Sequence, residues 1–154
     1  MLKTIRLNDD KEIKLKSSAA TNILYKKLFR EDILLTITSY TKNLQELQNM
    51  QAKFTQLKED STKSREELVA IINEMTNSEA FTTAQKFQSE TLPKLAFIMY
   101  LEANETMETI FSKLTEEQYL FWLMTIDQDE LLAVVGEVME IWQAGSRTNS
   151  KPKN

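Results

Sequence analysis

Glycine and proline are almost absent from this chain of 154 residues, and their scarcity limits the possible folds more than any other feature. The sequence holds two of each, Gly136, Gly145, Pro93 and Pro152. Sheets and barrels need many tight turns, and such turns depend on these residue types. Hydrophobic residues make up 42% of the chain, which is enough for a globular core. We therefore predict a mainly α protein, a multi-helix bundle with one helical domain over residues 1–146.

The first sixteen residues are an exception, because their pattern indicates a small N-terminal β-hairpin. Ile5 and Leu7 share one face of a strand, and so do Ile13 and Leu15. A polar Asn-Asp-Asp-Lys turn separates the two pairs, and such residues favour turns because they bond to their own backbone. We expect a hairpin over residues 3–16 that packs on a helix, because an isolated hairpin is marginally stable in water.

Helices are expected from residue 19 onward, and the longest runs from Glu31 to about Asp60 without glycine or proline. Gln51 and Phe54 continue a 4-3-4-3 spacing that is typical of coiled coils. The apolar residues that carry this spacing are Ile33, Ile37, Tyr40, Leu44 and Leu47. Two interpretations remain open: a bundle helix packed within its own domain, and a helix through which two copies dimerise.

Shorter helices are predicted in the rest of the chain. Pro93 suits a first helical turn, and the run at 95–101 is apolar on all sides, which is typical of a central buried helix. The stretches at 115–118 and 127–130 have the residues of N-terminal capping boxes. Gly145 suits the position just after a helix end.

The sequence contains no cysteine and no histidine, which removes disulfides, thiolate nucleophiles and the commonest metal ligands. Paired acids such as Glu116 and Glu117 are adjacent on a helix and point about 100° apart, so they do not converge on one atom. Asp127 and Asp129 resemble a calcium loop, but Leu132 stands where that loop needs glycine. We expect no catalytic residue, no cofactor, no metal and hence no enzyme.

Charge is unevenly distributed along the chain. Residues 1–30 carry eight basic and three acidic side chains, residues 31–146 carry eight and twenty, and residues 147–154 carry three and none. The acidic body would repel a phosphate backbone, so we expect no nucleic-acid partner. No apolar run approaches the ~20 residues of a membrane span, and the start lacks the apolar core of a signal peptide. We expect a cytoplasmic protein with no membrane partner and a flexible basic tail at 147–154.

An apolar surplus at 119–124 indicates a surface for other proteins. This segment holds more apolar side chains than one helix face can bury. We assign Trp122 and Leu123 to the core, and we predict that some of the others contact a partner or a second copy of the chain. With the basic residues of the tail, the predicted partner-binding set is Leu120, Phe121, Met124, Arg147, Lys151 and Lys153.

Three stretches are similar to a known family. Lys3-Thr-Ile-Arg-Leu, a turn and Glu12-Ile-Lys-Leu-Lys resemble the opening hairpin of the small tail assembly chaperones of long-tailed bacteriophages and prophages of Gram-positive bacteria. The segment at 19–29 followed by Asp-Ile-Leu resembles their first helix, and 95–104 resembles their central apolar helix. Members often carry glycine just after the phenylalanine that ends the first helix, where Arg30 and Glu31 stand in this chain.

The resemblance implies a cytoplasmic chaperone that is made during infection and is absent from the finished virion. It would bind the long helical tape measure protein, keep it soluble and help tail tube protein to assemble around it. In many members a programmed ribosomal frameshift adds a C-terminal extension that recruits tail tube protein. The rival hypothesis is a coiled-coil adaptor or regulatory protein that forms a homo-oligomer through residues 33–54.

Overall fold

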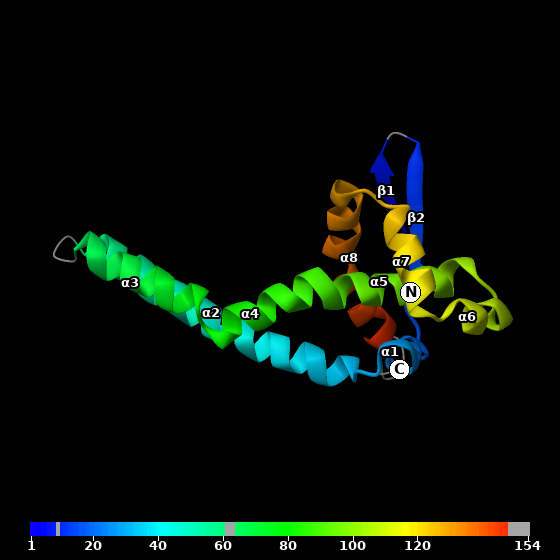
Figure 1. Ribbon diagram of the computed structural model, residues 1–154, viewed down its shortest axis with the longest axis horizontal. Coiled ribbons are helices and arrows are strands. Elements are labelled where there is room, and N and C mark those ends of the chain that lie inside the picture. Colours follow the sequence, from blue (N-terminus) through cyan, green and yellow to red (C-terminus); the bar gives the residue numbers. More distant parts are fainter. Residues whose placement is uncertain (9, 61–63, 148–154) are drawn as a thin grey trace, which may run out of the picture. The chain divides into compact units, whose positions relative to one another are not determined.

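The computed structural model describes residues 1–8, 10–60 and 64–147, with side chains described up to residue 145. In chain order the elements are β1 (Leu2–Asn8), β2 (Lys11–Lys16), α1 (Thr21–Phe29), α2 (Ile33–Glu59), α3 (Arg65–Thr76), α4 (Glu79–Lys86), a π-helical turn η1 (Phe87–Thr91), α5 (Leu92–Asn104), α6 (Met107–Lys113), α7 (Glu116–Met124) and α8 (Gln128–Arg147) (Figure 1). The prediction of a mainly α protein with a small N-terminal β-hairpin is confirmed.

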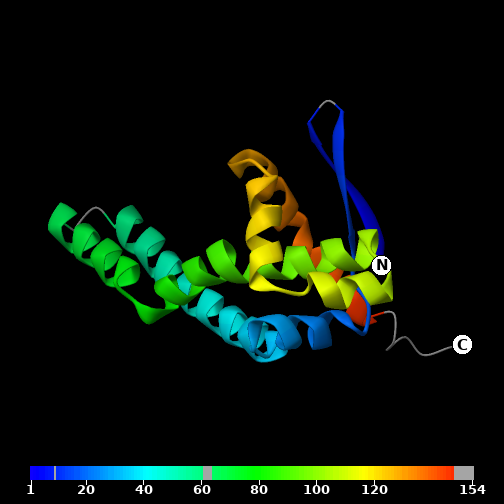
Figure 2. The ribbon, with the colours of Figure 1, turned by 45° about the vertical axis from the view of Figure 1, so that its right-hand side comes forward.

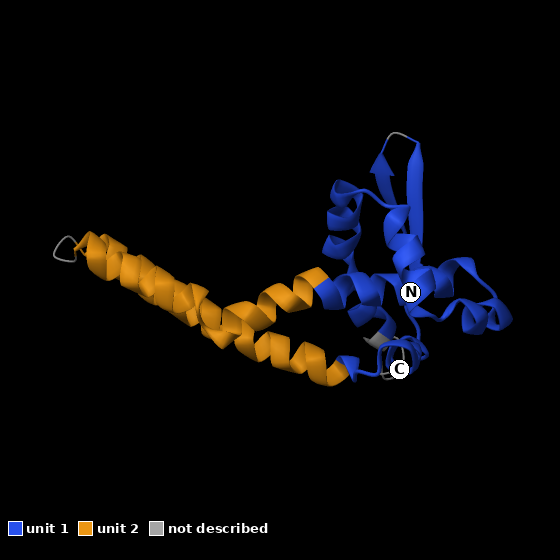
Figure 3. Cartoon of the chain, in the orientation of Figure 1, with its two compact units in different colours: residues 1–33, 90–154 blue, residues 34–89 orange. Residues whose placement is uncertain are grey.

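The chain forms two compact units, shown in different colours in Figure 3. Unit 1 comprises residues 1–33 and 90–154, and unit 2 comprises residues 34–89. Unit 1 thus joins the start of the chain to its last part, and unit 2 is inserted between them. The prediction of one helical domain over residues 1–146 stays a prediction, because two compact units can still fold together as one domain.

Helix α5 is the centre of unit 1. Eight of its thirteen residues are buried, because it contacts β2, α1, α6, α7 and α8. A helix covered on so many sides must be apolar around its whole circumference. The prediction of a central buried helix at 95–101 is therefore confirmed.

The hairpin packs one face on the helices of unit 1. Ile5 and Ile13 are paired across the antiparallel ladder and are both buried, and Leu15 is fully buried. Strand β2 contacts α5, and β1 contacts α8. At the edge, Lys3 Nζ donates to Glu137 Oε2 of α8 at 2.5 Å. The hairpin thus has one apolar face towards the helices, as its period-two pattern predicts.

Gly145 does not end the last helix, so that prediction is wrong. Helix α8 continues to Arg147, and no glycine has a positive φ. The position needs glycine for another reason: an added Cβ would overlap Ser17 Oγ and lie 2.8 Å from Ser17 Cβ. Ser17 Oγ donates to Ile141 O of α8 at 2.5 Å. Gly145 therefore allows the segment after β2 to approach α8 closely.

Arg30 ends α1 in the left-handed conformation, with φ 61° and ψ 25°. Its backbone N–H donates to Lys26 O at 2.9 Å, which satisfies one of the last carbonyls of the helix. Glycine adopts this conformation most easily, because it has no Cβ. The turn after α1 therefore forms here with an arginine in a conformation that favours glycine.

Unit 2 is a helical hairpin in which α2 runs beside α3 in both views (Figures 1 and 2). Ser64 Oγ accepts from Glu67 N at 3.2 Å and starts α3, and Ser78 Oγ accepts from Phe81 N at 3.2 Å and starts α4. The ring of Tyr40 on α2 stacks on that of Phe87 in η1, with 3.9 Å between ring centroids.

The row of apolar residues along one side of α2 (the apolar seam) differs from its predicted register at Gln51. Tyr40, Leu44 and Leu47 are half-buried as the spacing predicts, but Gln51 is exposed and Met50 is half-buried instead. The seam then continues at Phe54 and Leu57, both half-buried. Gln51 is polar and its neighbour Met50 is apolar, so the apolar side chain is the one that is covered, while Phe54 keeps its predicted place.

Candidate protein-binding site

Side-chain caps start both α7 and the helix that follows it, α8. Thr115 Oγ1 accepts from Gln118 N at 3.2 Å, which starts the helix. After its end, Asp127 Oδ1 accepts from Glu130 N at 2.8 Å, and Glu130 Oε1 accepts from Asp127 N at 3.1 Å. These caps start α7 and α8 where the sequence predicts, and of these two the cap at Asp127 and Glu130 has the full reciprocal pair.

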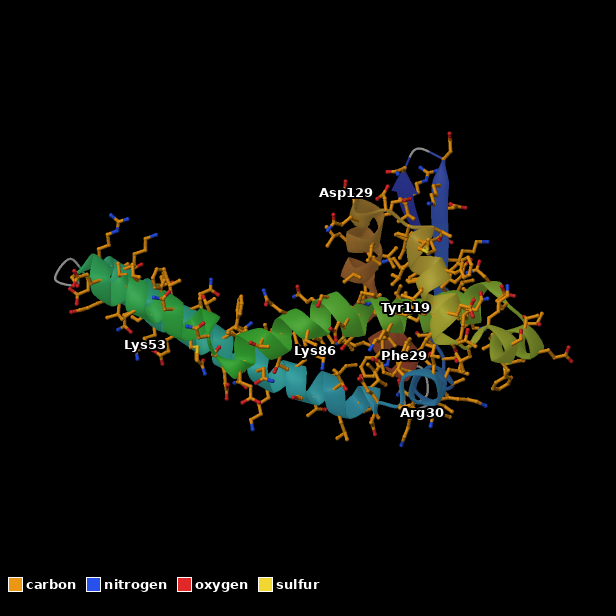
Figure 4. All side chains as sticks on the ribbon, in the orientation of Figure 1. Phe29, Arg30, Lys53, Lys86, Tyr119 and Asp129 are labelled. Atoms are coloured by element: carbon orange, nitrogen blue, oxygen red, sulfur yellow. The ribbon has the colours of Figure 1, made fainter. Side chains whose placement is uncertain are left out.

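The inner face of α7 packs on aromatic rings. Trp122 is buried, with its ring centroid 5.6 Å from those of Phe97 and Tyr100 on α5. The Tyr119 ring lies 5.4 Å from Phe97 and 5.4 Å from Phe29 of α1 (Tyr119 and Phe29 are labelled in Figure 4). Burial raises the pKa of Tyr119 to about 12, so its hydroxyl stays protonated at neutral pH. These tilted ring pairs fix the orientation of α7 on the core.

The outer face of α7 carries three apolar side chains that the structure leaves exposed. Leu120 is 59% exposed, Phe121 57% and Met124 83%. Leu120 and Met124 are four residues apart and Phe121 and Met124 three, so the three are neighbours on the helix surface. Trp122 is buried and Leu123 is half-buried. The structure thus presents the predicted residues to solvent, and their binding to a partner stays a prediction.

A groove of about 380 Å³ adjoins this face, lined by residues of α5, α6 and α7. Phe97, Tyr100 and Trp122 form its aromatic wall, and the exposed ring of Phe121 stands at its edge. The volume suits one or two apolar side chains of another protein, and buried aromatic walls are typical of binding hot spots.

An ion pair also lines the groove. Lys113 Nζ of α6 lies 2.6 Å from Glu105 Oε1, just before α6. This hydrogen bond lowers the pKa of Glu105 and raises that of Lys113, with their mutual attraction acting in the same direction. Both groups are therefore charged at neutral pH and give the apolar groove one polar side that can orient a bound helix.

The side chains of the other three predicted residues lie outside the described part of the chain, so their role stays a prediction. Arg147 is the last residue of α8 and its side chain lies outside the described part, as do Lys151 and Lys153. Sequence reasoning missed the exposure of Met107 and Phe111 on α6, which accompany the buried Ile110. The shortness of the predicted helix could have indicated this exposure, because a helix of two turns cannot bury four apolar side chains on one face.

The described residues lack two further kinds of feature. No group of three or more acidic, histidine or cysteine side chains among them could hold a metal ion. No helix within the described ranges is long and apolar enough to cross a membrane.

No protein-family model, curated protein or solved structure matches this chain. The chain is thus a mainly helical protein with an exposed apolar face on α7 beside an aromatic groove.

Proposed function

We propose that this protein is a tail assembly chaperone of a long-tailed bacteriophage or prophage. Its client is the tape measure protein, which it keeps soluble while tail tube protein assembles around it. It acts in the host cytoplasm and is absent from the finished virion. The observation that carries the proposal is the exposed apolar face of α7, Leu120, Phe121 and Met124, beside the aromatic groove.

The geometry suits a helical client. An amphipathic helix lays its apolar residues into a hydrophobic groove at intervals of three and four residues. The α7 face offers the same spacing, and the groove next to it accepts a projecting side chain. A chaperone must also release its client, and a small face gives modest affinity at each site. Many copies along one long client still shield it, because repeated weak contacts give high avidity.

Co-expression tests the proposal. The tape measure protein from the same genome should be largely insoluble alone, and soluble and co-eluting when this chain is present. Replacing Leu120, Phe121 and Met124 together by serine should abolish the rescue, since it removes the apolar contact without disturbing buried groups.

A matched control removes three other exposed apolar side chains, Val69, Ile72 and Leu132, in the same way. This control variant should rescue the client as well as the parent chain does. Loss of rescue in both variants, or in neither, would contradict the assignment of the client site to α7.

The structure also offers one observation in favour of the coiled-coil adaptor. No residue of α3 is buried, and none of α2 from 38 to 59 is buried. The α2–α3 hairpin of a second copy could cover the half-buried apolar side chains of these two helices, so that the four helices form a bundle. Leu44→Asp would then convert a dimer into a folded monomer in sedimentation experiments. If the parent chain is monomeric at high concentration, the adaptor hypothesis fails.

A further inference from the structure

A second surface of unit 1, where α1 ends, carries a cluster of positive charge. Lys26, Lys27 and Arg30 line a surface hollow of about 470 Å³ and are all exposed. Within the described part of the chain, none of the three forms an ion pair with an acidic side chain. The hollow therefore presents three cations to solvent.

Apolar side chains accompany these cations. Ile23 is 70% exposed and precedes Lys26, Lys27 and Arg30 by three, four and seven residues, which places it on the same side of α1. Lys27 Nζ lies 4.5 Å from the centre of the Phe111 ring of α6, and Phe111 is itself 50% exposed. The surface is thus both cationic and apolar, and two helices contribute to it.

The backbone of Arg30 adds a second observation. A non-glycine residue in the left-handed conformation is strained, and such strain is common at sites that bind ligands. Cations in the last turn of a helix also complement its dipole, which accounts for Lys26 and Lys27. A glycine at position 30 would end α1 without this strain, whereas the arginine adds a third cation to the hollow.

We propose that this surface, defined by Ile23, Lys26, Lys27, Arg30 and Phe111, binds a short acidic amphipathic helix of a partner protein. Carboxylates of that helix pair with the three cations, and its apolar residues cover Ile23 and Phe111. A nucleic acid fits less well, because residues 31–146 carry twenty acidic and eight basic side chains and repel a long polyanion. The surface shares no residue with the α7 face or the residues that line its groove.

A binding measurement with a defined probe tests this proposal. The probe is a fluorescent two-heptad peptide with leucine at the core positions and glutamate elsewhere, and its counterpart carries lysine in place of glutamate. The full chain should bind the acidic peptide, bind the lysine peptide at least about tenfold more weakly, and lose affinity for the acidic one as salt rises to ~300 mM.

Variants assign this binding to the cluster. Lys26→Glu with Arg30→Glu should weaken it at least about tenfold, whereas the same reversal at Lys53 and Lys86 in unit 2 should have little effect (Figure 4). Ile23→Ser should weaken binding without changing its salt dependence. Equal affinity for both peptides, no binding of the acidic peptide, or no effect of the double reversal would each overturn the proposal. Tighter binding of a single-stranded oligonucleotide through the same cations would overturn it as well.

Arg30→Gly separates binding from folding. Glycine relieves the left-handed strain, so this variant should unfold at a higher temperature than the parent chain while binding the acidic peptide more weakly. A variant that is more stable and binds equally well would show that the Arg30 side chain takes no part, which would contradict the proposed surface.

Discussion

Gly136 and Gly145 lie in the same helix, and their surroundings give them opposite roles. A Cβ at position 136 would meet nothing within 4 Å, whereas a Cβ at 145 would overlap Ser17 Oγ. Glycine inside a helix costs roughly 0.5–1 kcal/mol relative to alanine, so Gly136 reduces the stability of α8 without any packing reason. Gly145 incurs the same cost but allows the contact with Ser17.

Alanine substitution at the two positions should therefore change stability in opposite directions. Gly136→Ala should raise the free energy of unfolding by about 0.5–1 kcal/mol, because it reduces the entropy of the unfolded chain. Gly145→Ala should lower it by about 1–3 kcal/mol, because an overpacked contact must separate. Urea unfolding followed by tryptophan fluorescence measures both, since Trp122 and Trp142 lie in unit 1. A stabilising Gly145→Ala would contradict the close approach.

At the scale of elements, Glu102 joins α5 to the start of α1. Its carboxylate accepts from Ser18 Oγ at 2.5 Å and from Thr21 Oγ1 at 2.6 Å. Burial raises the pKa of Glu102 above its usual 4.5, although the two hydroxyls, Lys16 and the terminal amino group act in the opposite direction. The folded chain therefore holds this proton to a higher pH than the unfolded chain does.

This shift predicts how stability depends on pH. Because the folded state binds the Glu102 proton more tightly, the free energy of unfolding should fall as pH rises from about 4.5 to the raised pKa. Glu102→Gln keeps an oxygen that can accept one hydroxyl bond and cannot titrate, so it should remove this part of the slope. Urea unfolding of both chains between pH 4 and 7 measures the difference, and identical slopes would contradict a raised pKa.

The helices of the two units differ in burial, and this difference predicts their local stability. Eight residues of α5 are buried, whereas α3 has none. Backbone amides exchange quickly where few buried apolar contacts oppose local opening. In the free monomer, amides of α3 and of α2 beyond Ile37 should exchange at least about tenfold faster than those of α5. Equal protection would indicate that another chain already covers the hairpin of unit 2.

Local patterns predicted most elements, and the exceptions have physical causes. The hairpin, the buried α5 and the caps of α7 and α8 depend on neighbouring residues, so period and capping signals suffice. Met50 rather than Gln51 is half-buried because it is the apolar one of two adjacent residues, whereas a spacing count selects the position and ignores the side chain. The role of Gly145 depends on Ser17, which is distant in sequence. For the candidate site, the surplus at 119–124 identified the exposed residues, while the groove required the placement of α5 and α6.

Considered as a whole, the molecule has different surfaces for the different contacts that we propose. The α7 face and its groove receive an apolar client, and the cationic surface at the end of α1 receives an acidic helix. The half-buried apolar residues of α2 and α3 would form an interface only if two copies of the chain associate. These assignments use side chains that the structure leaves exposed, and they require neither a metal nor a cofactor.

Hydrogen exchange of the free chain and of its complex with the tape measure protein would show whether the client binds at α7. The account predicts that amides of α7 and of the adjoining α6 become more protected in the complex, while those of α2 and α3 keep their free-state rates. Protection confined to α2 and α3 would contradict the account and assign binding to unit 2.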